Sequence, residues 1–189
     1  MHRAALASIA AALALSGCGT LGQVEQGRVI AYDRQTRRVT LIREDAAASR
    51  SSPGILPPVT IAAPADPNEM GPAPSAGGLM LLDVRNRRIV IYDRVTRAFR
   101  SIAYTTLEER RNVGQTPGPP VVDRARKTIT LYAAKERMLI TFGASDDLLA
   151  MPADTWRAGD VVRYYYKDHP ARALRLMNVT QTDLSKATG

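Results

Sequence analysis

The chain contains a single cysteine, Cys18, among 189 residues. One cysteine excludes an internal disulfide, so the fold has to rely on an apolar core. The sequence also lacks Gly-x-x-x-x-Gly-Lys, a glycine-rich pattern that cradles phosphates, and Gly-x-Ser-x-Gly, the pattern around the nucleophile of many serine hydrolases. These absences remove the P-loop of many nucleotide-binding proteins and one large hydrolase class.

Long apolar runs are nearly absent too. Residues 4–15 form the longest, twelve residues of which only Ser8 is polar, and they follow the basic residue Arg3. A transmembrane helix needs about 20 apolar residues, so this run is too short to span a bilayer. Its length and its positive flank are typical of the apolar core of a cleaved signal peptide.

The next residues are Leu15-Ser16-Gly17-Cys18. This tetrapeptide resembles the lipobox of bacterial lipoprotein precursors. The resemblance implies that residues 1–17 are a cleaved signal peptide and that Cys18 carries lipid and becomes the first residue of the mature protein. Gly19 stands where an Asp would favour the inner membrane, so the outer membrane is the more favoured site. The alternatives are a secretory signal that happens to contain a cysteine, or a buried apolar helix.

After cleavage the chain would keep 172 residues with a net charge of +7, since Arg3 leaves with the signal peptide. Residues 18–26 then form a tether, whose eight residues after Cys18 reach at most about 28 Å. We therefore expect the membrane, through the lipid on Cys18, to be one partner of the folded part. A basic surface can attract polyanions. No run of five basic residues exists, however, and we predict no nucleic-acid partner.

Alternating apolar residues separated by polar turns predict antiparallel strands through most of the chain. The hairpins or meanders fall at 27–42, 79–104, 127–142 and 160–180. Two turns share a motif, because residues 92–97 repeat residues 32–37 as Tyr-Asp-Arg-x-Thr-Arg. The repeat indicates either one hairpin solution used twice, which we favour, or a duplicated ligand-binding turn.

Two further segments depart from the pattern of alternating strands. Residues 46–78 hold seven of the twelve prolines and predict a poorly ordered insertion, with one edge strand at 58–62. Thr105 with Glu108, or Thr106 with Glu109, fits a capping box and predicts a short helix at 106–112. We thus expect a single β-domain at 27–182, of eight to ten strands, followed by a tail at 183–189.

Residues 127–180 contain two hairpins, the second opened by Gly159-Asp160. This order resembles the small periplasmic OB-like β-barrels, including the copper-binding barrels of metal efflux systems. The resemblance implies an all-β fold, an antiparallel barrel or rolled sheet that is OB-like in its second half. The copper site does not carry over: Met138 stands in a suitable strand, but no histidine or second methionine is spaced with it, and Trp156 lies elsewhere.

Catalytic chemistry has few candidate residues. His169, the one histidine left after signal cleavage, precedes Pro170 in a predicted turn, where a solvated role is the ordinary one. Asp146, Asp147, Asp154 and Asp160 form a loose acidic group without the spacing of a calcium loop. We predict no cofactor and no metal, and a carboxylate-dependent hydrolase is the least favoured reading.

The candidate ligand surface is the strand around Tyr164 and Tyr166, which share one face of a strand while Tyr165 takes the other. With Arg163 and Lys167, these rings can stack on a sugar or a base. The simpler alternative is a strand with aromatic side chains packed on both faces. The sequence favours a non-enzymatic lipoprotein that contacts an envelope protein or polymer; a ligand-binding or metal-binding barrel is the alternative.

Overall fold

The computed structural model describes residues 21–43, 56–113 and 120–182, and the lipobox with Cys18 lies outside them. The described chain is mostly β, with three antiparallel sheets and one short α-helix. Its twelve strands exceed the eight to ten expected. They are β1 (Gln23–Asp33), β2 (Arg38–Arg43), β3 (Val59–Ala62), β4 (Leu79–Asp83), β5 (Arg88–Asp93), β6 (Ala98–Ala103), β7 (Thr106–Arg111), β8 (Val121–Asp123), β9 (Thr128–Ala133), β10 (Met138–Gly143), β11 (Val161–Tyr166) and β12 (Arg175–Asn178).

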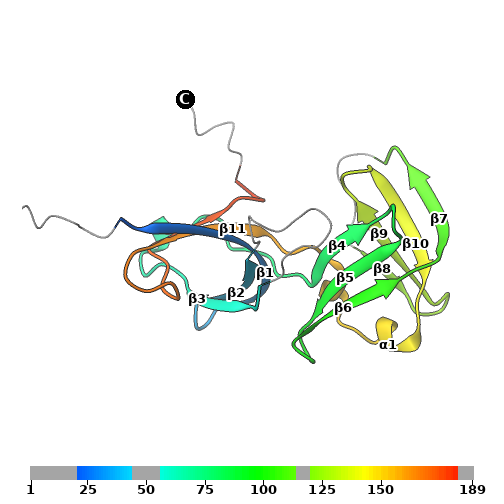
Figure 1. Ribbon diagram of the computed structural model, residues 1–189, viewed down its shortest axis with the longest axis horizontal. Coiled ribbons are helices and arrows are strands. Elements are labelled where there is room, and N and C mark those ends of the chain that lie inside the picture. Colours follow the sequence, from blue (N-terminus) through cyan, green and yellow to red (C-terminus); the bar gives the residue numbers. More distant parts are fainter. Residues whose placement is uncertain (1–20, 44–55, 114–119, 183–189) are drawn as a thin grey trace, which may run out of the picture.

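The strands form two lobes along the longest axis of the molecule (Figure 1). Lobe 1 is the five-stranded sheet β12-β11-β1-β2-β3, built from the two ends of the described chain. Lobe 2 holds β4 to β10 together with helix α1 (Asp146–Leu149). The first strand begins at Gln23, so β1 takes up the last four residues of the expected tether.

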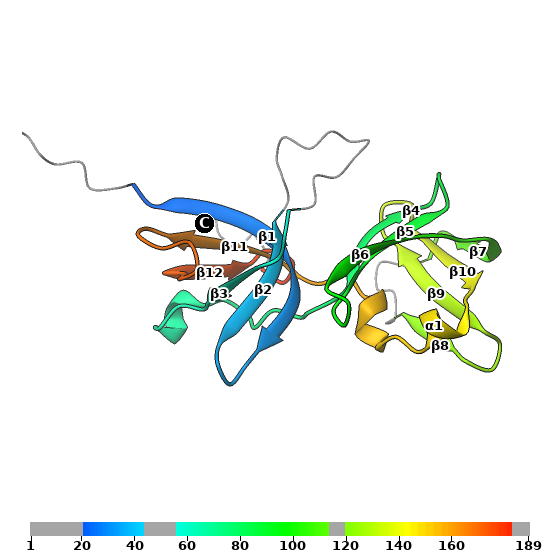
Figure 2. The ribbon, with the colours of Figure 1, turned by 60° about the horizontal axis from the view of Figure 1, so that its bottom comes forward.

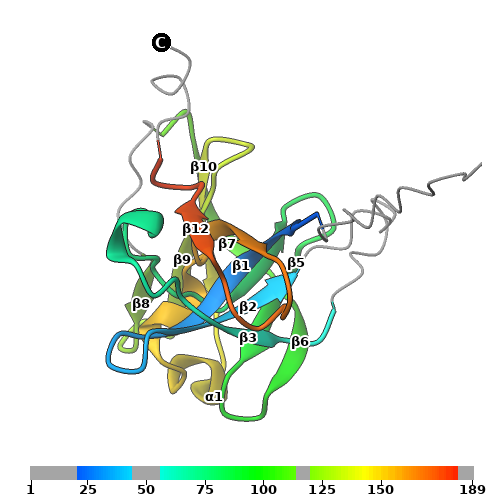
Figure 3. The same cartoon turned by 90° about the vertical axis from the view of Figure 1, so that its left-hand side faces the viewer.

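The sheet of lobe 1 curls until its two edges approach, as the end-on view shows (Figure 3). Near β3, the Ala62 amide donates to the Ala171 carbonyl oxygen at 2.8 Å, and the Ala173 amide donates back to Ala62 at 3.0 Å. Met70 makes a second isolated parallel bridge, to Leu176. Isolated bridges do not make a continuous ladder, and no closed barrel forms in the described residues.

Lobe 2 has a three-stranded sheet, β4-β5-β6, and a four-stranded sheet, β7-β10-β9-β8. Ile89 and Ile91 of the first sheet join Ile140 and Phe142 of the second in one apolar cluster. Trp156, from the 3₁₀ turn η2 (Ala153–Trp156), packs edge-on against Phe142 with ring centroids 6.2 Å apart. The aliphatic strand residues recognised in the sequence thus supply this core.

The chain crosses between the lobes twice, through segments that run side by side (Figure 2). We call residues 75–79 and 157–160 the neck. The Gly77 amide donates to the Val29 carbonyl oxygen at 3.1 Å, and the Leu79 amide donates to that of Arg157 at 3.0 Å. A Cβ on Gly159 would collide with the Val29 carbonyl oxygen, so this crossing requires glycine.

The Tyr-Asp-Arg-x-Thr-Arg repeats form the same turn. Asp33 accepts hydrogen bonds from the amides of Gln35 and Thr36 at 2.9 and 3.2 Å. Asp93 does the same for the amides two and three residues on, at the same distances. Each turn closes with a left-handed arginine, Arg37 at φ 52° and Arg97 at φ 54°. One local solution therefore serves a hairpin in each lobe.

Two predictions were wrong. Residues 106–112 are mainly β7, paired with β10 in register Thr106↔Phe142 and Arg111↔Met138, and the described α-helix lies at 146–149. A seven-residue helix has little stability of its own, so residues 106–111 instead pair with the free edge of β10. The second half is also not one OB-like unit, because β9 and β10 lie in lobe 2 while β11 and β12 lie in lobe 1.

The proline-rich insertion is described only from residue 56 onward. Its predicted edge strand is confirmed as β3, which pairs with β2 at the end of the sheet. The hydroxyls of Thr40 and Thr60 lie 3.0 Å apart across this pair. The stretch 46–55 of the prediction lies outside the described residues, and a 3₁₀ turn, η1 (Pro67–Glu69), follows β3.

Candidate functional site

Strand β11 carries polar and aromatic side chains on two faces of lobe 1. Tyr164 and Tyr166 point inward and are 1% and 6% exposed. Arg163 is exposed and Tyr165 is partly exposed, and both lie on the outer face of the sheet. The predicted alternation of the tyrosines is therefore confirmed.

The inner face holds a hydrogen-bonded carboxylate. The Tyr164 hydroxyl donates to Glu25 Oε2 at 2.6 Å, and Arg43 Nη1 donates to the same oxygen at 2.9 Å. The Tyr166 hydroxyl lies 2.9 Å from Glu25 Oε1 and 2.6 Å from Gln23 Oε1. Glu25 and Tyr164 face each other in the register of β1 and β11, which explains how residues 139 apart in sequence come together.

Charges and hydrogen bonds in this cluster reinforce each other. Burial raises the pKa of Glu25, but hydrogen bonds from Tyr164, Arg43 and Tyr166 outweigh it, and the net pKa is lowered. Burial and the hydrogen bond to Glu25 raise the pKa of Tyr164 far above its ordinary value. The cluster therefore keeps an ionised carboxylate beside neutral phenols, an arrangement that stabilises the sheet and contains no group poised to exchange protons near neutral pH.

The four predicted site residues do not come together. The rings of Tyr164 and Tyr166 stack on each other, with centroids 5.8 Å apart, inside lobe 1. Arg163 lies on the opposite face, where its Nη2 donates to the Gln26 amide oxygen at 3.2 Å. Lys167 is exposed just beyond the end of β11. A ligand can reach Arg163 and Lys167, but it cannot reach the faces of the two buried rings.

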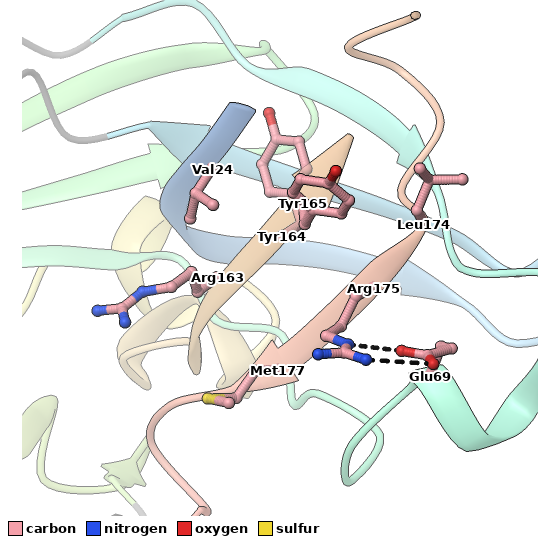
Figure 4. A pocket seen from close by; sticks show the side chains of 8 residues that line it. All are labelled: Val24, Glu69, Arg163, Tyr164, Tyr165, Leu174, Arg175 and Met177. Carbon is pink, nitrogen blue, oxygen red and sulfur yellow. Dashed lines mark hydrogen bonds and ion pairs between the residues drawn. The ribbon is translucent and has the colours of Figure 1, made fainter. Parts of the chain in front are cut away.

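A hollow of about 540 Å³ does lie beside β11, on the outer face of lobe 1 (Figure 4). We call it the outer groove. Its side chains come from β1, β11, η1, β12 and the segment before β12, and they combine apolar and charged groups. The lining residues are Val24, Glu69, Arg163, Tyr164, Tyr165, Leu174, Arg175 and Met177.

An ion pair closes one wall of the outer groove. Arg175 Nε and Nη2 donate to Glu69 Oε2 and Oε1 at 2.5 and 3.2 Å. The bidentate contact lowers the pKa of Glu69 and raises that of Arg175. Asp66 caps the preceding turn by accepting from the Asn68 amide at 2.9 Å, which holds Glu69 in position.

The floor of the groove is apolar and exposed. Val24 is 59% exposed and Leu174 is 45% exposed, and Val24 lies opposite Tyr165 in the β1–β11 register. The Tyr165 ring packs directly on Gly22, where a Cβ would collide with it. Sequence reasoning missed Val24, Leu174 and Arg175; the signal available was an apolar residue, Val24, inside a stretch assigned as a polar tether.

The residues tested for catalysis are dispersed. His169 Nδ1 accepts from the Ala171 amide at 3.2 Å in an exposed turn, beside a hollow of about 360 Å³. Asp146 pairs with Lys127, Asp147 with Arg100 and Asp154 with Arg94. Asp160 is buried in the neck, where it accepts from Asn178 at 2.9 Å and Gln181 at 2.6 Å. Across the described ranges, no three His, Cys, Asp or Glu side chains form a metal cluster.

The comparison with protein families gives one match. Residues 20–187 fit a family described as a domain of unknown function, DUF4881. The chain belongs to the DUF4881 family. No curated protein and no solved structure matches this DUF4881 chain. Among the described residues of the DUF4881 protein, no helix is both long and apolar enough to cross a membrane.

Proposed function

We propose that this protein is a lipid-anchored envelope protein whose mature chain begins at an acylated Cys18. The observation that carries the proposal is the order of residues 1–18, with one basic residue, a short apolar run and Leu15-Ser16-Gly17-Cys18. As the sole cysteine, Cys18 has no disulfide partner within the chain. Two or three acyl chains at this position hold a protein firmly on a bilayer. The periplasmic face of the outer membrane is the favoured location.

The arrangement of the lobes fits an anchored protein. Leu21, the first described residue, follows Cys18 by three positions, which span at most about 11 Å. Strand β1 starts at the end of the long axis opposite lobe 2 (Figure 1). With Cys18 in the membrane, lobe 1 is held against the bilayer and lobe 2 is presented away from it, toward an envelope protein or polymer.

A non-enzymatic role agrees with the chemistry of the described residues. The acidic side chains named above are engaged in ion pairs or hydrogen bonds, and His169 sits in a solvated turn. The alternative, a small-ligand module, draws on the outer groove, which is large enough for a drug-sized molecule. It predicts that a small molecule copurifies with the protein.

The proposal includes a finer description of lobe 1 as an OB-like unit. Strands β1, β2 and β3 form a meander, the β11–β12 hairpin adds on the other side of β1, and the β3 end bridges in parallel to the segment before β12. This is the connectivity of a partly open five-stranded Greek-key barrel. Lobe 2 then is an insertion between the third and fourth strands.

Metabolic labelling with palmitate tests the anchor. The native protein should incorporate label and partition with membranes, and Cys18→Ser should do neither. Ser16→Ala keeps a small residue in the lipobox and serves as the matched control, which should stay labelled. Mass spectrometry of the mature N-terminus checks the same point, since an unmodified Cys18 or an uncleaved chain would refute the proposal.

A further inference from the structure

Exposed apolar side chains gather at the end of lobe 1 where the described chain begins. Leu21 is 93% exposed, and it is followed by Val24 at 59%. Leu174, from the segment before β12, lies in the same groove at 45%. Single exposed aliphatic residues are common on soluble proteins, but grouped ones mark contact surfaces.

The apolar residues of the outer groove lie next to one another, and basic side chains lie beside them. Val24, Tyr165 and Arg175 are aligned across β1, β11 and β12. Arg163 precedes Tyr165 by two residues on β11 and therefore lies on the same face. Lys167 and Arg172 line a neighbouring hollow, which shares Leu174 with the outer groove. Glu69 is already paired with Arg175, and the neighbouring hollow also contains two acidic residues, Asp66 and Asp168. Arg163 and Lys167 have no ion pair among the described residues.

The position of the anchor points to the occupant of this face. One headgroup layer is about 5–8 Å deep, since a bilayer of about 40–45 Å has a hydrocarbon core of about 30 Å, so the at most about 11 Å between Cys18 and Leu21 keeps Leu21 within a few ångströms of that layer. The acyl chains on Cys18 thus bring this end of lobe 1 into the headgroup region. Aliphatic and aromatic side chains with neighbouring guanidinium groups match the boundary between acyl chains and phosphates.

We propose that the outer face of β1, β11 and β12 docks on the anionic headgroup layer of the membrane that holds Cys18. We call it the docking face, defined by Val24, Arg163, Tyr165, Leu174 and Arg175. The proposal rests on the proposed lipid anchor but goes beyond it, because an anchor alone leaves the domain free to tumble on its tether. Docking fixes the orientation of lobe 2 relative to the bilayer.

The acylated sole cysteine makes a clean labelling experiment possible, because an introduced cysteine is the only free thiol. Val24→Cys places an environment-sensitive fluorophore on the docking face, and Val95→Cys, at an 83% exposed turn of lobe 2, is the matched control. Both proteins are purified with lipid on Cys18 and reconstituted in vesicles of phosphatidylcholine with phosphatidylglycerol. Nitroxide-labelled lipid should quench the label at position 24 and leave that at position 95 unchanged.

The outcomes separate docking from anchoring. An intact mass without acyl chains refutes the anchor, whatever the quenching. An acylated protein whose position 24 is no more quenched than position 95 refutes docking and leaves the anchor standing. Quenching at both positions equally also overturns the proposal, as does a signal at position 24 that rises with protein concentration without vesicles, which assigns the face to a second copy. A copurified small molecule that shields position 24 would assign the groove to a ligand.

The cationic part of the proposal is tested by charge removal. Arg163→Gln should lower the ratio of docked to undocked protein about five-fold on phosphatidylglycerol vesicles, the effect of one basic residue near an anionic surface. Arg124→Gln, an exposed arginine of lobe 2, should leave the ratio unchanged. Equal ratios for Arg163→Gln and the native protein, or no dependence on phosphatidylglycerol, would overturn the role of the headgroup charge.

Discussion

Lobe 1 and lobe 2 are both antiparallel β-structures, but they are assembled differently. Lobe 2 uses one continuous stretch, from β4 to η2, and its central cluster is apolar, with Phe142 and Trp156 at its middle. Lobe 1 pairs strands from opposite ends of the chain and encloses the hydrogen-bonded carboxylate of Glu25. Local hairpins close short loops, whereas the β1–β11 pair closes a loop of more than 100 residues. We infer that lobe 2 forms first and brings the two halves of lobe 1 together.

The largest effect is expected from emptying the core of lobe 2. Phe142 is 1% exposed and packs between Tyr104, at 5.3 Å between centroids, and Trp156. Phe142→Ala should lower the free energy of unfolding by about 3–5 kcal/mol. Urea unfolding followed by the fluorescence of Trp156, the one tryptophan of the chain, measures it. Phe99→Ala removes the other phenylalanine, which is only half-buried. An equal loss of unfolding free energy in that variant would contradict the central place of Phe142 in the core of lobe 2.

The neck should be the next most sensitive place. Gly159→Ala sets a methyl group against the Val29 carbonyl oxygen and should cost about 1–3 kcal/mol. Gly143→Ala is the matched change in lobe 2, where the nearest atom to a new Cβ is a Leu107 methyl at 3.9 Å. Hydrogen exchange of the Val29 amide should quicken in the first variant and stay as in the native protein in the second. Similar losses of stability in both variants would show that the neck is no more sensitive to an added methyl group than lobe 2 is.

The polar core of lobe 1 should respond to the loss of one hydroxyl. Tyr164→Phe removes the 2.6 Å hydrogen bond to the Glu25 carboxylate and should cost about 1.5–3 kcal/mol, as for a hydrogen bond to a charged group. Tyr165→Phe makes the same chemical change on the outer face and should stay within about 0.5 kcal/mol. Thermal unfolding of the pair reports the difference, and indistinguishable transitions would refute a structural role for the cluster.

The smallest expected effect is a pH dependence that belongs to lobe 1. Because the pKa of Glu25 is lowered in the folded protein, its contribution is complete above the ordinary value of 4.5 and is lost as the pH falls through the folded-state pKa. Glu25→Gln should therefore flatten the fall in stability on acidification. Glu69→Gln, whose lowered pKa arises in an exposed ion pair, should flatten it less. Denaturation series from neutral pH to below 4.5 compare the slopes.

Much of the fold was predictable because its hairpins are encoded locally. An Asp that binds its own backbone and a strand of alternating residues identify the β1–β2 and β5–β6 turns within a short window. The failures were non-local. The capping-box pattern at Thr105 is a weak preference that pairing with β10 overrides, and the joining of β11 to β1 across the chain cannot be read from the second half alone.

The candidate site was predictable to a similar extent. The period of two placed Tyr164 and Tyr166 on one face, as found. The sequence of β11 alone does not say which of its faces is buried. The hydroxyls of Tyr164 and Tyr166 both bind Glu25, which lies on the distant strand β1. Val24 and Arg175 belong to strands that only the folded register brings beside Arg163. The outer groove therefore depends on the order of the strands in the sheet, which the sequence alone does not give.

The two crossings of the neck have a consequence for how the protein can vary. Where the chain leaves lobe 1 and where it returns, Gly78 donates to the Asp154 carbonyl oxygen at 3.0 Å, so the ends of lobe 2 are neighbours. A segment whose ends already touch can be exchanged for a shorter or longer one at little cost to its host. Lobe 2 can therefore vary in length on a constant lobe 1, provided that each version still covers Ile30 and Ile42, which are buried against Tyr92 of lobe 2.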